Sequence, residues 1–129
     1  KLSDTIDSIV SSGAIPIIVE DTPTLSGKSP KCPIKQQIFN EQLDCGIKYT
    51  DNSMLAEIFS ELKINNPSIL LINPRALYCD GEACKMTLNG LPLYRDDDHL
   101  NEIGAELLAT EYLKVFKNPF SKTTLMNSD

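Results

Sequence analysis

Long apolar runs and an excess of positive charge are both missing from this sequence. No stretch of its 129 residues approaches the roughly 20 consecutive apolar residues that a transmembrane helix needs. The first residues, "KLSDTIDSIV", lack the apolar centre and small-residue cleavage site of a signal peptide. We therefore expect any membrane anchor or targeting signal to lie outside these residues.

The balance of charge argues against one class of partner. The formal net charge is −6, and the 12 basic residues are scattered without forming a stripe. An acidic surface repels phosphate groups, so we expect no nucleic-acid partner. Hydrophobic residues at 41% and charged residues at 23% exclude collagen-like and broadly disordered chains, and the length is enough to bury a core.

The four cysteines are even in number and lie in stretches rich in Pro, Gly and Asp: Cys32, Cys45, Cys79 and Cys84. This placement favours disulfides over buried thiols. A four-thiolate zinc site is the alternative, but it typically shows paired C-x-x-C spacing, which is absent here. Four cysteines allow three connectivities. We favour the two local pairings, Cys32 with Cys45 and Cys79 with Cys84, because each lies within or beside one loop, and Asp80-Gly81 supplies turn chemistry in "CDGEAC".

Amphipathic patterns predict four helices, over about the first dozen residues and over residues 34–43, 50–64 and 101–116. Ser3, Thr50 and Asn101 are candidate N-caps, and Gly13 is placed to end the first helix. The apolar positions expected to face the core are Ile6, Ile9 and Val10, then Met54, Leu55, Ile58, Phe59 and Leu62, and finally Ile103, Leu107, Leu108, Val115 and Phe116.

Two short apolar runs, Ile15–Val19 and Ile69–Ile72, predict strands that are covered on both faces. Pro16 then lies near a strand start, where its missing N–H costs least. Asn89-Gly90 predicts the turn of a small hairpin. Between the first strand and the second helix, residues 22–33 form a long loop with three prolines, and such a loop is either functional or a surface excursion.

Buried strands that alternate with amphipathic helices predict an α/β fold with a parallel sheet. Only two central strands are visible, whereas a typical sheet has about 4 to 6. We therefore expect a partial domain over residues 1–117, with its missing strands upstream of Lys1, followed by a polar tail over residues 118–129.

The single histidine stands in "YRDDDHLNEIG", just before the last predicted helix. Asp96 and His99 are three residues apart, so the carboxylate can orient one imidazole nitrogen and leave the other free to accept a proton from a nucleophile. A solvated loop histidine is the plainer interpretation. A metal site is a third possibility, but three consecutive aspartates cannot all converge on one ion and no further ligand cluster completes it. We therefore predict no metal.

The segment "YRDDDHLNEIGA" resembles the last block of SGNH-type (GDSL-like) hydrolases, in which D-x-x-H-L precedes the final helix. More narrowly, "YCDGEACKM" followed by "NGLPLYRDDDHLNEIGA" resembles the C-terminal SGNH domain of acyltransferase family 3 membrane proteins. The resemblance implies a three-layer α/β/α fold with a flavodoxin-like parallel sheet. It also implies that His99 is the general base and Asp96 its orienting partner, while Asp97 and Asp98 are loop residues and Asp98 assists the helix start.

Two residues near His99 and two absent motifs bear on this resemblance. Asn101 replaces the usual serine after the His-Leu pair and is an equally competent cap. Gly104 is expected to allow close helix packing. The family's G-D-S block, with the nucleophilic serine, and its G-x-N-D block, with part of the oxyanion hole, are both absent. "LSGKS" at residues 25–29 lacks the strand-to-helix context of a nucleophile elbow. We therefore expect this chain alone to be inactive.

The resemblance implies one function and leaves two others open. The first is part of an extracytoplasmic domain of an inner-membrane acyltransferase that O-acylates, and specifically O-acetylates, cell-envelope polysaccharide such as lipopolysaccharide. Its partners are then the N-terminal part of the SGNH domain, a membrane-embedded domain and a glycan acceptor, with acetyl-CoA as the acyl donor and no cofactor bound by this chain. The alternatives are a secreted esterase acting on acylated glycans and a disulfide-stapled interaction module without enzymatic activity.

Overall fold

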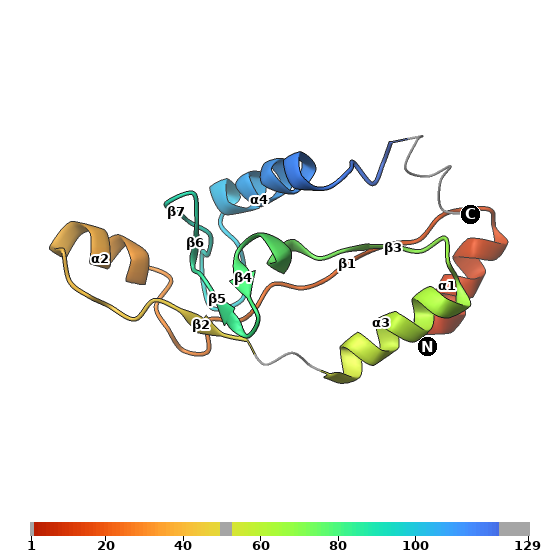
Figure 1. The fold of residues 1–129 in the computed structure, drawn as a ribbon, viewed down its shortest axis with the longest axis horizontal. Coiled ribbons are helices and arrows are strands. Elements are labelled where there is room, and N and C mark those ends of the chain that lie inside the picture. The colour runs from red at the N-terminus through yellow and green to blue at the C-terminus, as the bar shows by residue number, and fades with distance from the viewer. Residues whose placement is uncertain (1, 50–52, 122–129) are drawn as a thin grey trace. The chain divides into compact units, whose positions relative to one another are not determined.

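The structure, a computed structural model, describes residues 2–49 and 53–121 (Figure 1). The elements are, in chain order, α1 (Leu2–Ser11), β1 (Ile17–Val19), α2 (Cys32–Phe39), β2 (Ile47–Lys48), α3 (Ser53–Asn65), β3 (Leu70–Ile72), the 3₁₀ helix η1 (Pro74–Leu77), β4 (Cys79–Asp80), β5 (Ala83–Cys84), β6 (Thr87–Leu88), β7 (Leu91–Pro92) and α4 (Glu102–Val115). They form two compact units, one over Lys1–Glu20, Asp51–Ile72 and Phe116–Asp129, the other over Asp21–Thr50 and Asn73–Val115.

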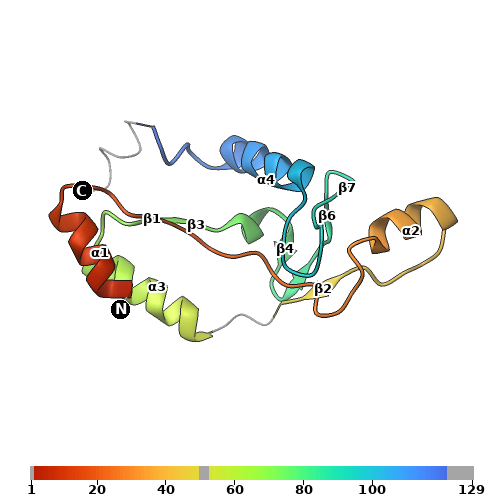
Figure 2. The same cartoon turned by 180° about the vertical axis from the view of Figure 1, so that it is seen from behind.

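The first unit contains the parallel pair of strands. β1 and β3 align in register from Ile17 opposite Leu70 to Val19 opposite Ile72. Helices α1 and α3 lie side by side in both views (Figures 1 and 2). Their apolar sides and the start of β3 form a small core around the buried side chains of Ile6, Leu62 and Ile69, with Val10, Ile18, Ile58, Phe59 and Leu71 packed against it. Most of the predicted stripes of the first two long helices therefore supply this core, but Leu55 is 45% exposed, and the side chain of Met54 lies outside the described part of the chain.

Several details of this unit differ from the sequence-based expectation. Ser3 lies inside α1, which already begins at Leu2, so its assignment as N-cap was wrong. Gly13 does end the helix, with a positive φ of 83° that suits glycine. Val19 is exposed, so β1 is not covered on both faces as predicted. Thr50, the proposed cap of the third helix, lies outside the described residues.

The second unit is built on short antiparallel strands. β4 and β5 pair Cys79 with Cys84, and β2 adds to the other edge of β5, which gives the order β2-β5-β4. β6 and β7 form a separate hairpin whose turn residues, Asn89 and Gly90, have φ values of 51° and 79°. Two positive φ values identify a type I′ turn, which confirms the hairpin predicted from Asn-Gly.

The core of the second unit lies under these hairpins and α4. Its buried members are Leu25, Ile47, Tyr78, Cys84, Met86, Leu93, Tyr94 and Leu108. Tyr94 donates a hydrogen bond from its hydroxyl to the carbonyl of Pro23 at 2.8 Å, which ties the long loop to this core. Burial raises the pKa of Tyr94, and it raises the pKa of Tyr78 more strongly. Both phenols therefore stay neutral, with their rings packed in the core and their hydroxyl groups hydrogen-bonded.

Helix α4 buries a narrower face than its sequence suggests. Leu108 is buried and Leu107 is half-buried, but Ile103 and Val115 are more than 60% exposed. The prediction that all five apolar positions face the sheet was therefore wrong. The buried face runs instead through Gly104 and Leu108, which are one helical turn apart.

Both disulfides are present in this unit and follow the two local pairings. Cys32–Cys45 joins the start of α2 to the segment before β2, across a sequence separation of 13. Cys79–Cys84 staples the directly paired residues of β4 and β5. The prediction of two local disulfides is therefore confirmed.

The parallel β1–β3 pair and the flanking helices confirm an α/β fold. The three-layer arrangement stays a prediction, as does the division at residue 117. The second helix was predicted over residues 34–43 and lies at Cys32–Phe39, ending at Asn40 in the left-handed conformation. No helix in the described part of the chain is long and apolar enough to span a bilayer.

Candidate functional site

The candidate site is the loop between β7 and α4, and its two ends are held firmly. Tyr94 and Leu100 form an isolated antiparallel bridge. The main-chain N–H of Arg95 donates to the carbonyl of His99 at 2.8 Å, which closes the loop between them. Because both neighbours of the loop belong to the second core or pack against it, the position of His99 is set by packing.

Asp96 organises this loop from within. Its Oδ1 accepts hydrogen bonds from the main-chain N–H of Asp98 at 3.3 Å and of His99 at 2.9 Å. The same oxygen lies 2.9 Å from Nδ1 of His99. Its other oxygen, Oδ2, accepts from Nε of Arg95 at 3.1 Å. The carboxylate is therefore fixed by the backbone before it contacts the imidazole, which is the arrangement an orienting residue needs.

These contacts favour the ionised form of Asp96. Its pKa is held well below the ordinary value of 3.8, chiefly because the main-chain N–H of His99 donates to the carboxylate. The imidazole, the Arg95 guanidinium and the main-chain N–H of Asp98 lower the pKa further, while desolvation opposes them. Asp96 is thus a charged acceptor at neutral pH and requires Nδ1 of His99 to carry the proton.

A second carboxylate reaches the same ring nitrogen. Oδ1 of Asp98 lies 2.9 Å from Nδ1 of His99, so the N–H faces two acceptors. Both side chains are 61% exposed, whereas Asp96 is 44% exposed and has the additional backbone contacts. The sequence interpretation gave Asp98 a role at the helix start and missed its contact with the ring. A run of three aspartates cannot indicate which carboxylates face the ring, because that depends on the backbone of the turn.

The remaining aspartate serves the neighbouring loop. The carbonyl of Asp97 accepts from the main-chain N–H of Leu25 at 2.7 Å, and its Oδ1 accepts from that of Gly27 at 3.2 Å. In this turn, Ser26 and Gly27 both have positive φ values, 52° and 82°. Ser26 thus occupies a conformation that disfavours side chains. The tight turn is docked on the site loop, a contact that sequence spacing of 70 residues could not reveal.

Asn101 and Gly104 attach the site loop to α4. The Oδ1 of Asn101 accepts from the main-chain N–H of Gly104 at 2.7 Å, which confirms Asn101 as the N-cap. Its Nδ2 donates to the carbonyls of Pro92 at 2.8 Å and Tyr94 at 3.3 Å. A Cβ on Gly104 would lie only 2.3 Å from the carbonyl oxygen of Leu93, so the glycine does permit close packing.

The arrangement leaves Nε2 of His99 available for chemistry. Nδ1 is occupied by the two carboxylates, and no serine hydroxyl of residues 2–49 or 53–121 contacts the imidazole. Asp96, Asp98 and His99 also bring one potential metal ligand each within 4.8 Å of one another. The same three residues are joined by the contacts described above, and the absence of a metal stays a prediction. The group thus brings two carboxylates to one nitrogen of an imidazole whose side chain is 61% exposed.

An open hollow of ≈ 460 Å³ lies beside this loop within the second unit. Its walls come from the start of α2, the hairpin strand β7, the beginning of the site loop and the first turn of α4: Pro30, Lys31, Ile34, Leu91, Pro92, Tyr94, Arg95, Asn101, Glu102 and Ile103. The lining is mainly apolar with charged groups among it. A hollow of this size is large enough for a small organic ligand.

Comparison with known proteins adds one finding. A family model described as "SGNH domain (fused to AT3 domains)" matches residues 1–114. The matched range includes Asp96, His99 and all four cysteines. Neither the curated proteins nor the solved structures gave a significant match.

Proposed function

Because the chain belongs to the family of SGNH domains that are fused to AT3 domains, we propose that it supplies the base of an acyl-transfer site in a membrane acyltransferase. The acyl group is acetyl, and the acceptor is a hydroxyl of a cell-envelope polysaccharide. The contact between Asp96 and Nδ1 of His99 at 2.9 Å is the observation that carries the proposal.

The chemistry assigned to the pair is proton transfer during ester exchange. A serine outside these residues gives its hydroxyl proton to Nε2 of His99 while its oxygen attacks the acyl carbonyl, and the acyl carrier leaves with that proton. In the second half, the hydroxyl of the glycan loses its proton to Nε2 and attacks the seryl ester. The serine oxygen then recovers the proton, so the site returns to its starting state.

Asp96 stabilises the imidazolium that forms in each half-reaction. Because its carboxylate is ionised and already held by the main-chain N–H of His99, it needs no rearrangement when the ring becomes charged. Asp98 adds a second negative charge 2.9 Å from Nδ1. We assign Asp96 the orienting role because it is the less exposed carboxylate and is fixed by the loop itself.

The hollow beside the loop is the place that we propose for the acceptor, because it adjoins the site loop and its wall includes the polar side chains of Lys31, Arg95 and Glu102. Its wall includes Tyr94 and Arg95, which immediately precede Asp96, so a bound glycan lies next to the site loop. The donor, acetyl-CoA, acts through the membrane-embedded domain and needs no binding site on this chain. The oxidising compartment implied by the two disulfides agrees with an extracytoplasmic, periplasmic location for this domain.

The test is acetyl transfer by the full-length protein, measured as acetyl groups incorporated into isolated envelope polysaccharide. We expect His99→Ala to lower the rate by at least about 100-fold, the low end of the contribution of a general base. Asp96→Asn should lower it more than Asp98→Asn. Glu106→Gln, an exposed change on α4, is the matched control and should leave the rate unchanged.

Two outcomes contradict the proposal. Transfer that survives His99→Ala would show that the imidazole is not the base. Release of free acetate from acylated glycan, with no transfer to a new acceptor, would support the secreted-esterase alternative instead.

A further inference from the structure

Helix α2 exposes a face that combines apolar and basic side chains, with two neighbouring lysines between apolar residues. None of its residues is buried. Ile34, Ile38 and Phe39 are 43%, 69% and 64% exposed, and Lys31 and Lys35 are exposed with them. At 3.6 residues per turn these five side chains occupy an arc of about 140°. The opposite side of the helix carries Pro33, Gln36 and Gln37, and the disulfide-bonded Cys32 lies at the edge of the face, next to Phe39.

The charge of this region is opposite to that of the chain. Residues 22–40 contain three lysines and no acidic residue, although the whole sequence has a net charge of −6. Lys28 is already committed, because its Nζ donates to Oδ2 of Asp44 at 2.8 Å and to the carbonyl of Gly46. Among the described residues, Lys31 and Lys35 have no ion-pair partner. Their ammonium groups are therefore free for an external anion.

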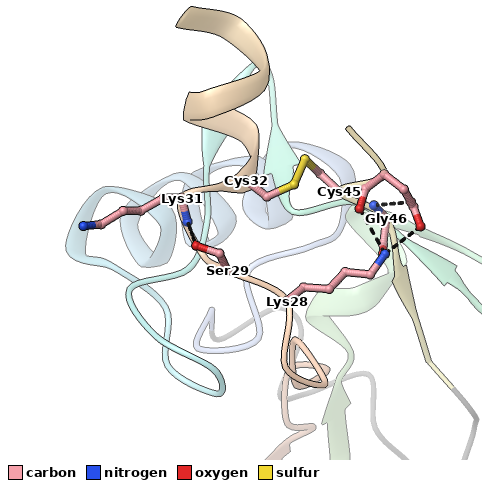
Figure 3. Close-up of a disulfide and its surroundings, with 7 residues drawn as sticks. Lys28, Ser29, Lys31, Cys32, Cys45 and Gly46 are labelled. Atoms are coloured by element: carbon pink, nitrogen blue, oxygen red, sulfur yellow. Dashed lines mark hydrogen bonds and ion pairs between the residues drawn. A yellow bond between two sulfur atoms is a disulfide. The ribbon is translucent and has the colours of Figure 1, made fainter. Parts of the chain in front are cut away.

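The helix is held in place although it has little core of its own. The Cys32–Cys45 disulfide attaches the first residue of α2 to the segment before β2 (Figure 3). Lys28, which precedes the helix, is joined to the same segment through its hydrogen bonds to Asp44 and Gly46. In Figure 3 the side chain of Lys31 extends away from the disulfide, on the opposite side from Lys28. Because the disulfide and Lys28 hold α2 in place, the helix need not become ordered when its exposed face binds a partner, and little conformational entropy is lost.

We propose that this face of α2, defined by Lys31, Ile34, Lys35, Ile38 and Phe39, binds the surface of an anionic phospholipid bilayer. The apolar side chains enter the interfacial region, and the two lysines contact the phosphate groups. Charge complementarity selects this occupant, because a neutral surface leaves both lysines unmatched. The fusion of this family to AT3 domains, which are membrane-embedded, places such a surface within reach of the domain.

This inference goes beyond acyl transfer, since it assigns a contact that orients the domain on the membrane. Ile34 and Lys31 also line the hollow beside the site loop. A bilayer bound at α2 therefore lies next to the edge of that hollow.

The experiment is co-sedimentation of the 129-residue chain with vesicles, either of phosphatidylcholine alone or with about one third phosphatidylglycerol. We expect binding only to the anionic vesicles, and weaker binding at high salt, which screens the lysines. Lys31→Glu/Lys35→Glu should lower the partition coefficient by at least about 25-fold, because each basic residue near such a surface contributes about fivefold. Ile38→Ser/Phe39→Ser should lower it by about tenfold or more through lost interfacial burial.

Two matched variants separate the α2 face from general effects. Lys85→Glu/Lys117→Glu changes the net charge by the same amount at exposed positions elsewhere, and Ile64→Ser removes an exposed apolar side chain from α3. Both should bind like the wild type. All the altered side chains are exposed, so thermal unfolding should show that each variant keeps the stability of the wild type.

The proposal is overturned if the wild-type chain does not bind anionic vesicles, or if the two α2 variants bind as well as the two controls. A wild-type dimer in solution that Ile38→Ser/Phe39→Ser dissociates, with no vesicle binding, would also overturn it. In that case a second copy of the chain covers the face. These readouts do not involve acyl transfer, so they fail or succeed independently of the proposed catalytic role.

Discussion

Replacing Gly104 with alanine should destabilise the second unit through one atom. The new Cβ would lie 2.3 Å from the carbonyl oxygen of Leu93 and 2.8 Å from its Cα. These are backbone atoms, so no side-chain rotation relieves the overlap. Overpacking of this kind lowers the free energy of unfolding by about 1–3 kcal/mol, and we expect the upper end of this range for a clash with main-chain atoms. The higher helix propensity of alanine relative to glycine raises the free energy of unfolding by about 1 kcal/mol. The expected net loss is therefore about 2 kcal/mol.

The same atom connects this change to the candidate site. The carbonyl of Leu93 also accepts the main-chain N–H of Asn101 at 2.9 Å, and Asn101 is two residues from His99. A displaced carbonyl should therefore disturb the loop as well as the helix.

Urea unfolding with intact disulfides measures the loss for Gly104→Ala as a lower midpoint with an unchanged slope. Ala109→Gly, at an exposed position of the same helix, is the control for propensity and should cost about 1 kcal/mol. The reasoning is refuted if Gly104→Ala is as stable as the wild type or gains the full propensity benefit. Either result would mean that α4 can move away from Leu93 without penalty.

Three further predictions concern stability and ionisation. Cys32→Ser/Cys45→Ser should lower the free energy of unfolding by about 3 kcal/mol, the loop-closure contribution for a separation of 13 residues, as measured by urea unfolding without reductant. Tyr94→Phe should cost about 1–3 kcal/mol in the same assay, because the carbonyl of Pro23 loses a buried donor; a loss below 0.5 kcal/mol would show that water replaces it. Carboxyl ¹³C NMR should give Asp96 a pKa below 3.8, so its contribution to stability is present above about pH 4 and is lost as the pH falls through the lowered pKa. An ordinary pKa would contradict the hydrogen-bonded loop described above.

The local signals in the sequence were sufficient for much of the second unit. Asn89-Gly90 predicts its turn because two positive φ values are needed there, and Asn101 predicts the cap because its side chain resembles a missing main-chain acceptor. The cysteine pairings followed from loop lengths. Each of these inferences depends on interactions within a single turn, cap or loop.

What could not be predicted depends on contacts between distant residues. β2 pairs with β5 across 36 residues, from Ile47 to Cys84, and its two residues carry no periodicity of their own. The docking of Gly27 on Asp97 is equally remote in sequence. Ile103 has an apolar side chain at helical spacing, yet it is exposed because the buried face of α4 is set by Gly104. A hydrophobic pattern identifies a helix better than it identifies the side that is buried.

The pair of Asp96 and His99 was predicted from three-residue spacing and family resemblance, and the structure shows that their side chains are in contact, while their catalytic roles stay a prediction. The backbone of the turn brings the carboxylate of Asp96 to Nδ1 of His99. These 129 residues contain no G-D-S motif, the motif that carries the nucleophilic serine in the family. The central claim is therefore that His99 activates a serine located elsewhere in the protein.

The most direct test of that claim is labelling of the full-length protein with a fluorophosphonate, which reacts with activated serines. We expect one labelled serine outside these 129 residues, a labelling rate at least about 100-fold lower in His99→Ala, and an unchanged rate in Glu106→Gln. Labelling of the His99→Ala protein at the wild-type rate would contradict that claim.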